Sequence, residues 1–177
     1  MNAADIVKAA QSKLGIVEKG GPDGKSGNIV EFWDWWKSVT GENDQGSSWC
    51  AVFVSWCFST VPGGSALVAA KNPHGFIYCP DGVKFFKAHN QIIIPANAQP
   101  GDIIFFDWTG AGIADHVGIV IQNQVAKGFL LTIEGNTSPE GAAGASQSNG
   151  GGVYQRKRLL GKTIHAVARP AWETLAK

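Results

Sequence analysis

The sequence predicts an α+β protein whose N-terminal helices pack on a C-terminal antiparallel β-sheet. Near the N-terminus apolar residues recur at three-to-four spacing, as in an amphipathic helix, and Gly15 follows the first such run. Beyond Pro100 the pattern changes to period two, in short runs rich in β-branched and aromatic residues. Because helices come first and strands follow consecutively, the strands are expected to pair in antiparallel fashion.

Helices are expected over residues 3–14, 29–39 and 49–60. The last run, WCAVFVSWCFST, is β-branched and aromatic, which also suits a strand. A helix is favoured because Ser47 or Ser48 can cap it and because it is about three turns long. A short helix is expected over 82–88 inside a loop-rich section, 61–98, and polar loops are expected over 18–28 and 40–48.

The second half of the chain contains the predicted strands. They cover residues 102–107 (DIIFFD), 116–122 (HVGIVIQ), 129–134 (FLLTIE), 153–158 (VYQRKR) and 165–169 (HAVAR). The glycine-rich segment 141–152 lies between two of these strands, so it is expected to be a hairpin loop rather than a domain linker.

Length and composition restrict the organisation and the partners. The chain has 177 residues and shows no internal repeat, so a single domain over residues 1–177 is expected. Its formal net charge of +1 gives no argument for nucleic acid as a partner. The N-terminus lacks the pattern of a secretory signal, and no apolar run approaches about 20 residues, so no membrane insertion is expected. No association motif is visible, and a monomer is expected.

The last part of the chain is more basic than the rest. From Gly128 to Lys177 there are six lysines and arginines against three acids. The simplest interpretation is a solvated strand face, and the alternative is weak attraction to an anionic polymer.

Three cysteines are present, at positions 50, 57 and 79. The number is odd and the spacing fits no zinc pattern, so neither a disulfide framework nor a structural metal is expected. Cys50 would lie in the first turn of its helix, where free N–H groups and the helix dipole lower a thiol pKa and favour the nucleophilic thiolate. The alternative is that Cys50 is a small buried hydrophobic residue. Cys57 is expected in the core, Cys79 in a loop, and a bridge between these two stays open.

A thiol nucleophile needs a base and a group that orients the base. Among the four histidines, His116 is preferred because it begins a predicted strand after a glycine-rich turn. If that strand and the next form a hairpin, Glu134 or Asn136 lies beside His116 and can fix its tautomer. Asp115 competes for this role, although its side chain should point away from that of the adjacent His116.

Four segments carry a specific resemblance: 48–57 (SWCAVFVSWC), 100–106 (PGDIIFF), 116–120 (HVGIV) and 133–136 (IEGN). In this order they resemble the CHAP family, the cysteine, histidine-dependent amidohydrolases/peptidases, and in particular its phage endolysin-type members. The resemblance implies a papain-like core and cleavage of amide bonds in peptidoglycan. It also implies Cys50 as nucleophile, His116 as base, and Glu134 and Asn136 as orienting residues. A related Cys-His-His family fits less well, because Glu134 stands where that scheme has its second histidine.

Substrate contacts are expected around the nucleophile. Trp49, Trp108 and the loop up to Asp115 would line the cleft, although core packing is an equal alternative for the tryptophans. The Cys50 N–H, with a donor from Gln45 to Ser48, would stabilise the oxyanion. Some family members bind calcium ahead of the nucleophile, but loop 41–46 here has too few carboxylates, so neither metal nor cofactor is expected.

The expected function is therefore that of an endolysin, cutting peptidoglycan as an N-acetylmuramoyl-L-alanine amidase or as a cross-bridge endopeptidase. It would be made in the host cytoplasm without a signal peptide and would act on the wall after release, without a separate wall-binding module. The alternatives are an injected antibacterial amidase toxin, a virion-associated hydrolase, a non-catalytic wall-binding module, or a protease of ordinary proteins.

Overall fold

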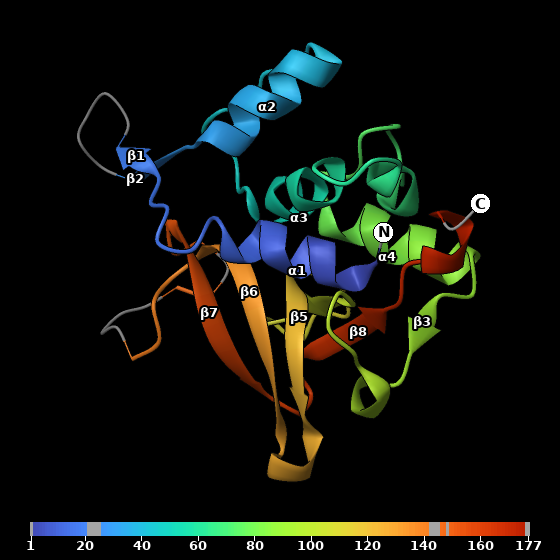
Figure 1. The fold of residues 1–177 in the computed structure, drawn as a ribbon. Coiled ribbons are helices and arrows are strands. Elements are labelled where there is room, and N and C mark those ends of the chain that lie inside the picture. Colours follow the sequence, from blue (N-terminus) through green and yellow to red (C-terminus); the bar gives the residue numbers. More distant parts are fainter. Residues whose placement is uncertain (1, 21–25, 142–145, 148, 176–177) are drawn as a thin grey trace.

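The computed structural model describes residues 2–20, 26–141, 146–147 and 149–175, and within them it confirms the α+β fold. Its helices are α1 (Ala3–Gln11), α2 (Glu31–Thr40), α3 (Cys50–Ser59) and α4 (Cys79–Ala88). Figure 1 shows α1, α3 and α4 gathered on one side of the sheet, with α2 beyond α3. Helix α3 is central, because it contacts α1, α2 and the strands β5 and β6.

The main sheet has the strand order β3-β8-β4-β5-β6-β7, and each neighbouring pair is antiparallel. Its strands are β3 (Ile92–Ile93), β4 (Ile103–Phe106), β5 (His116–Gln124), β6 (Phe129–Thr137), β7 (Gly152–Leu159) and β8 (Ile164–Ala168). The five predicted strands are all present. Within the main sheet as described, β3 is the strand that was not anticipated, because two residues are too short for a period-two pattern.

Three local expectations were wrong. Part of the predicted loop 18–28 forms a small antiparallel ladder, in which β1 (Lys19–Gly20) pairs with β2 (Ser26–Ile29). Helix α3 is a helix, as favoured, but it begins at Cys50 after Trp49 and has no side-chain cap, so neither Ser47 nor Ser48 caps it. Helix α4 begins at Cys79, three residues earlier than predicted, with a proline in its first turn where the missing N–H is harmless.

Helix α3 approaches the sheet closely at a glycine. Nearly all its residues are buried, which fits a helix that is apolar on every side. A Cβ at Gly135 of β6 would lie 2.7 Å from the Trp49 ring and 2.8 Å from Phe53 Cβ. The absence of a side chain at Gly135 therefore lets the first turn of α3 rest against β6.

Candidate active site

Cys50 is the first residue of α3 and is 4% exposed. The N–H groups of a first helical turn have no partners within the helix, and the positive end of the helix dipole lies there. Both features favour a thiolate at this position. The packing of α3 against β5 and β6 fixes where the thiol lies.

A second thiol lies beside the first. Cys79 Sγ is 3.9 Å from Cys50 Sγ, and the structure has both cysteines free. Cys79 is the first residue of α4, so two helix N-termini converge on this thiol pair. The hydrogen bond from Cys79, followed by the contact and charge of His116, outweighs burial and lowers the pKa of Cys50 well below its ordinary value. The same contact and burial raise the pKa of Cys79.

The proximity of Cys79 could not be read from the sequence, because the pattern placed that residue in a loop. Cys57, in contrast, lies in the core as expected. It is fully buried, and burial raises the pKa of its thiol. The bridge between Cys57 and Cys79 that the sequence left open is not formed.

His116 begins β5 and is completely buried. Its Nε2 lies 2.9 Å from Glu134 Oε2, while its Nδ1 has no hydrogen-bond partner in the described part of the chain. Burial alone would lower the pKa of His116, but the hydrogen bond and charge of Glu134, with the proximity and charge of Cys50, raise it to about 9. At neutral pH this geometry favours a protonated imidazole beside a Cys50 thiolate.

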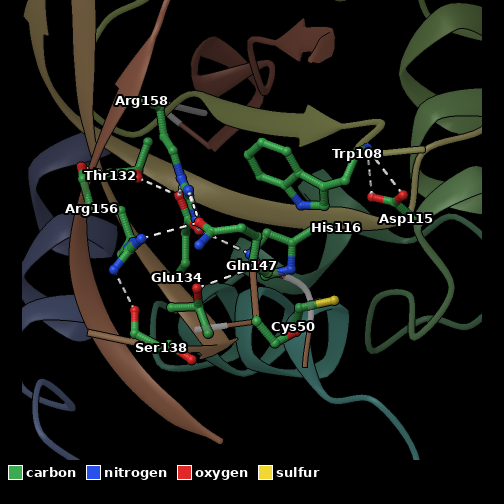
Figure 2. Close-up of polar contacts among 12 residues, drawn as sticks. Cys50, Trp108, Asp115, His116, Thr132, Glu134, Ser138, Gln147, Arg156 and Arg158 are labelled. Carbon is green, nitrogen blue, oxygen red and sulfur yellow. Dashed lines mark hydrogen bonds and ion pairs between the residues drawn. The ribbon is translucent and has the colours of Figure 1, made fainter. Parts of the chain in front are cut away.

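Glu134 accepts hydrogen bonds from three side chains (Figure 2). Thr132 Oγ1 donates to Oε1 at 2.5 Å and His116 bonds to Oε2. Arg158 donates from Nε to Oε1 at 2.7 Å and from Nη2 to Oε2. Burial would raise the pKa of Glu134, but the bonds from Arg158 and His116 lower it to about 2. The carboxylate is therefore ionised across the physiological range.

The expectation of a solvated face for the basic C-terminal region was wrong on β7. Arg156 and Arg158 are each 6% exposed. Their spacing of two residues puts both on one face of the strand, and this was the available sequence signal. It could not be used, because nothing in the sequence showed that this face is buried against Glu134.

The other predicted orienting residues have different partners. Asp115 accepts the backbone N–H of Trp108 through both carboxylate oxygens, at 3.0 and 3.2 Å, and so closes the loop before β5. Asn136 is buried near the end of β6 with a φ of 55°, a left-handed conformation that asparagine tolerates. The orienting contact described for His116 is the one to Glu134.

Two predicted substrate contacts need correction. Trp49 is fully buried, donates from Nε1 to Glu18 at 3.1 Å and packs on Phe32, so it belongs to the core and cannot line a cleft. Gln45 uses both N–H bonds of its carboxamide on Val30 and Asp34, which leaves none for an oxyanion.

Trp108 is half-buried and lies next to the candidate base. Its ring centroid is 6.4 Å from that of His116, and it stacks on Phe106. Its Nε1 has no hydrogen-bond partner among the residues that the structure describes. This indole N–H is therefore a donor left over at the site.

The described ranges contain neither a metal-binding cluster nor a membrane-spanning helix. No group of three or more histidine, cysteine or acidic side chains there could hold a metal ion. None of the helices described is long and apolar enough to cross a membrane.

Comparison with known families matches the CHAP domain over residues 42–136, more than half of the chain. The chain therefore belongs to the CHAP family. Domains of this family are typically cysteine, histidine-dependent amidohydrolases, and the family implies amidase or peptidase activity on peptidoglycan in general. The matched range contains Cys50, His116 and Glu134, whereas Arg158 lies outside it. No curated protein matches the chain.

Proposed function

We propose that this protein hydrolyses amide bonds of peptidoglycan with Cys50 as nucleophile and His116 as general base and acid. The observation that carries the proposal is the buried series formed by the Cys50 thiol, the His116 ring and the Glu134 carboxylate. A nucleophile, a base beside it and a group that orients the base are the minimum that thiol acyl transfer requires.

The proposed reaction begins from the thiolate–imidazolium pair. The Cys50 sulfur attacks the amide carbonyl, and the carbonyl oxygen becomes an oxyanion. The Cys50 backbone N–H, which has no partner within its own helix, would donate to that oxygen. His116 then gives its proton from Nδ1 to the leaving amine, and water hydrolyses the thioester with His116 again as base.

Glu134 keeps the imidazole productive throughout this cycle. Its bond to Nε2 requires the proton to be on that nitrogen, so Nδ1 is the one that exchanges a proton with Cys50. The one hydrogen bond described for the ring thus assigns a separate task to each nitrogen of His116.

The biological role that we propose is that of an endolysin. The chain would work as a single monomeric catalytic domain, be made in the host cytoplasm and meet the wall after release. The bond cut would be the N-acetylmuramoyl-L-alanine amide or a cross-bridge amide, since the same thiol chemistry serves both.

The test is the clearing of purified peptidoglycan by the parent protein, Cys50→Ala and Cys57→Ala. Cys57 is the matched control, because it lies on the same helix and is also buried, while no histidine is among the groups that shift the pKa of its thiol. Clearing by the parent and Cys57→Ala, but not by Cys50→Ala, supports the mechanism. Mass spectrometry of the products then separates the two bonds: free L-alanine amino termini indicate amidase, and split cross-bridges indicate endopeptidase.

Other outcomes would contradict the proposal. Equal clearing by Cys50→Ala would mean that the nucleophile is misassigned. Tight wall binding without clearing by the folded parent, on several wall types, would favour a binding module. Cleavage of casein with intact walls would favour a general protease.

A further inference from the structure

Arg158 bonds directly to Glu134 of the candidate active site, whereas the residues predicted from the sequence to bind substrate have no described hydrogen bond to Cys50, His116 or Glu134. It lies on β7, outside the range matched by the family model, and its guanidinium is buried. Nε and Nη2 donate to the two different oxygens of Glu134, which is the bidentate arrangement that fits a carboxylate. Figure 2 shows this guanidinium on the side of Glu134 away from Cys50.

The remaining parts of the guanidinium also have partners. Nη1 donates to Oε1 of Gln147, and Gln147 belongs to the glycine-rich segment between β6 and β7. The guanidinium carbon lies 4.8 Å from the centre of the Trp108 ring and 5.2 Å from that of Phe106, so two aromatic rings shield it. A planar group held this way has little freedom to leave Glu134.

The charged groups around Glu134 come from three elements. His116 faces it from β5, and Arg158 and Arg156 face it from β7, while Cys50 of α3 lies beyond His116. Arg156 donates to Ser138 O and to Gln147, and its described bonds do not include Glu134. Arg158 is therefore the cation in direct contact with the carboxylate.

We propose that Arg158 is a positioning residue of the hydrolase, which holds the Glu134 carboxylate ionised and in one orientation toward His116. This inference rests on the proposed function, because it extends the series of Cys50, His116 and Glu134 by one residue. Arg158 touches no reacting atom and acts through Glu134.

Loss of Arg158 would change the protonation of Glu134 at acid pH. A buried carboxylate without a cationic partner takes up a proton at higher pH than one that is paired. Once Glu134 is neutral, it no longer stabilises the imidazolium, and Cys50 retains its own proton. Loss of Arg158 should therefore move the acid limb of Cys50 reactivity to higher pH.

The experiment compares Arg158→Met, Arg158→Lys and Arg156→Met with the parent. Arg156→Met is the matched control, since it removes a buried arginine from the same strand face and the same Gln147 contact without touching Glu134. Two pH profiles are measured: alkylation of Cys50 by iodoacetamide, located by mass spectrometry, and clearing of purified peptidoglycan. Arg158→Met should move the acid limb of both upward by about one pH unit, a roughly tenfold loss of thiolate at a fixed acid pH. Arg156→Met removes a charge that has no direct bond to Glu134, so it should move the limb much less.

An acid limb at the parent position in folded Arg158→Met, or an equal movement in Arg156→Met, would overturn the proposal. If circular dichroism shows that Arg158→Met is unfolded, Arg158→Lys decides. Lysine keeps the positive charge but loses the bidentate geometry of the guanidinium, so a smaller upward shift of the acid limb is expected. An acid limb at the parent position in Arg158→Lys would count against the positioning role. Alkylation needs no wall substrate, so a parent that fails to clear walls refutes the proposed function without affecting this test.

Discussion

The strongest quantitative prediction concerns Glu134→Gln, which keeps the size of the side chain and removes its charge. The parent His116 has a pKa of about 9, against an ordinary value of 6.5. At about 1.4 kcal/mol for each pKa unit, this rise corresponds to roughly 3 kcal/mol in favour of the protonated ring, after burial has been overcome. Cys50 and Glu134 provide that stabilisation together.

The sign of the expected change follows from these contributions. Without the Glu134 charge, burial acts against a protonated ring that only the thiolate still supports. The pKa of His116 should therefore fall by at least about one unit, which lowers the protonated fraction in mild alkali about tenfold. The pKa of Cys50 should rise in parallel, because its partner is less often charged. The pH window of the thiolate–imidazolium pair would narrow from both sides.

Two measurements test this change. Carbon-detected or nitrogen-detected NMR titration of the His116 ring gives its pKa directly, and iodoacetamide alkylation of Cys50 gives the acid limb. Clearing of purified walls should be lost at both ends of the pH range before it is lost at the centre. A folded Glu134→Gln protein whose His116 still titrates near 9 would refute the reasoning, because the described partner of Nε2 would then contribute nothing.

Two further predictions concern the packing of the site. Gly135→Ala places a methyl group 2.7 Å from the Trp49 ring, and overpacking of this kind costs about 1–3 kcal/mol. The Tm should fall by roughly 2–12 °C, and alkylation of Cys50 should slow. Gly161→Ala is the control, because a methyl group there meets open space and should change neither quantity. Equal Tm values for the two variants would contradict the close approach of α3. Cys79→Ala removes the thiol that lowers the pKa of Cys50, so alkylation of Cys50 should begin at higher pH, and faster alkylation at acid pH would disprove the contact.

Much of the fold could be predicted because periodicity is a local property. The change from helical spacing to period two located the strands, and the hairpin of β5 and β6 brought His116 near Glu134 as the antiparallel pairing requires. The boundaries of α3 and α4 were less accessible. An apolar helix such as α3 has no polar face to mark its first turn, and α4 begins in a segment whose proline suggests a loop.

The contact between Arg158 and Glu134 could not be predicted from the sequence, for a different reason. It depends on the register of β6 and β7, in which Glu134 pairs with Tyr154 and Arg158 pairs with Leu130. The intervening glycine-rich segment is long, so its turn residues do not set this register. An arginine that reaches along the sheet to a residue not directly opposite it leaves no pattern in the sequence. Trp49 was misassigned because a tryptophan beside a nucleophile looks the same in sequence whether it packs inward or lines a cleft.

The close contact of α3 with β6 at Gly135 also bears on how the protein acquires its reactivity. Cys50 and His116 lie far apart in the chain, and an unfolded cysteine has an ordinary thiol with a pKa of about 8.5. Cys50 is therefore expected to be a mostly protonated, weakly nucleophilic thiol during synthesis, and to become reactive when α3 packs on the sheet. Refolding followed by rapid alkylation would time that docking step, since long-range contacts of this kind form late relative to local helices. The rate of Cys50 alkylation would thus report when folding is complete.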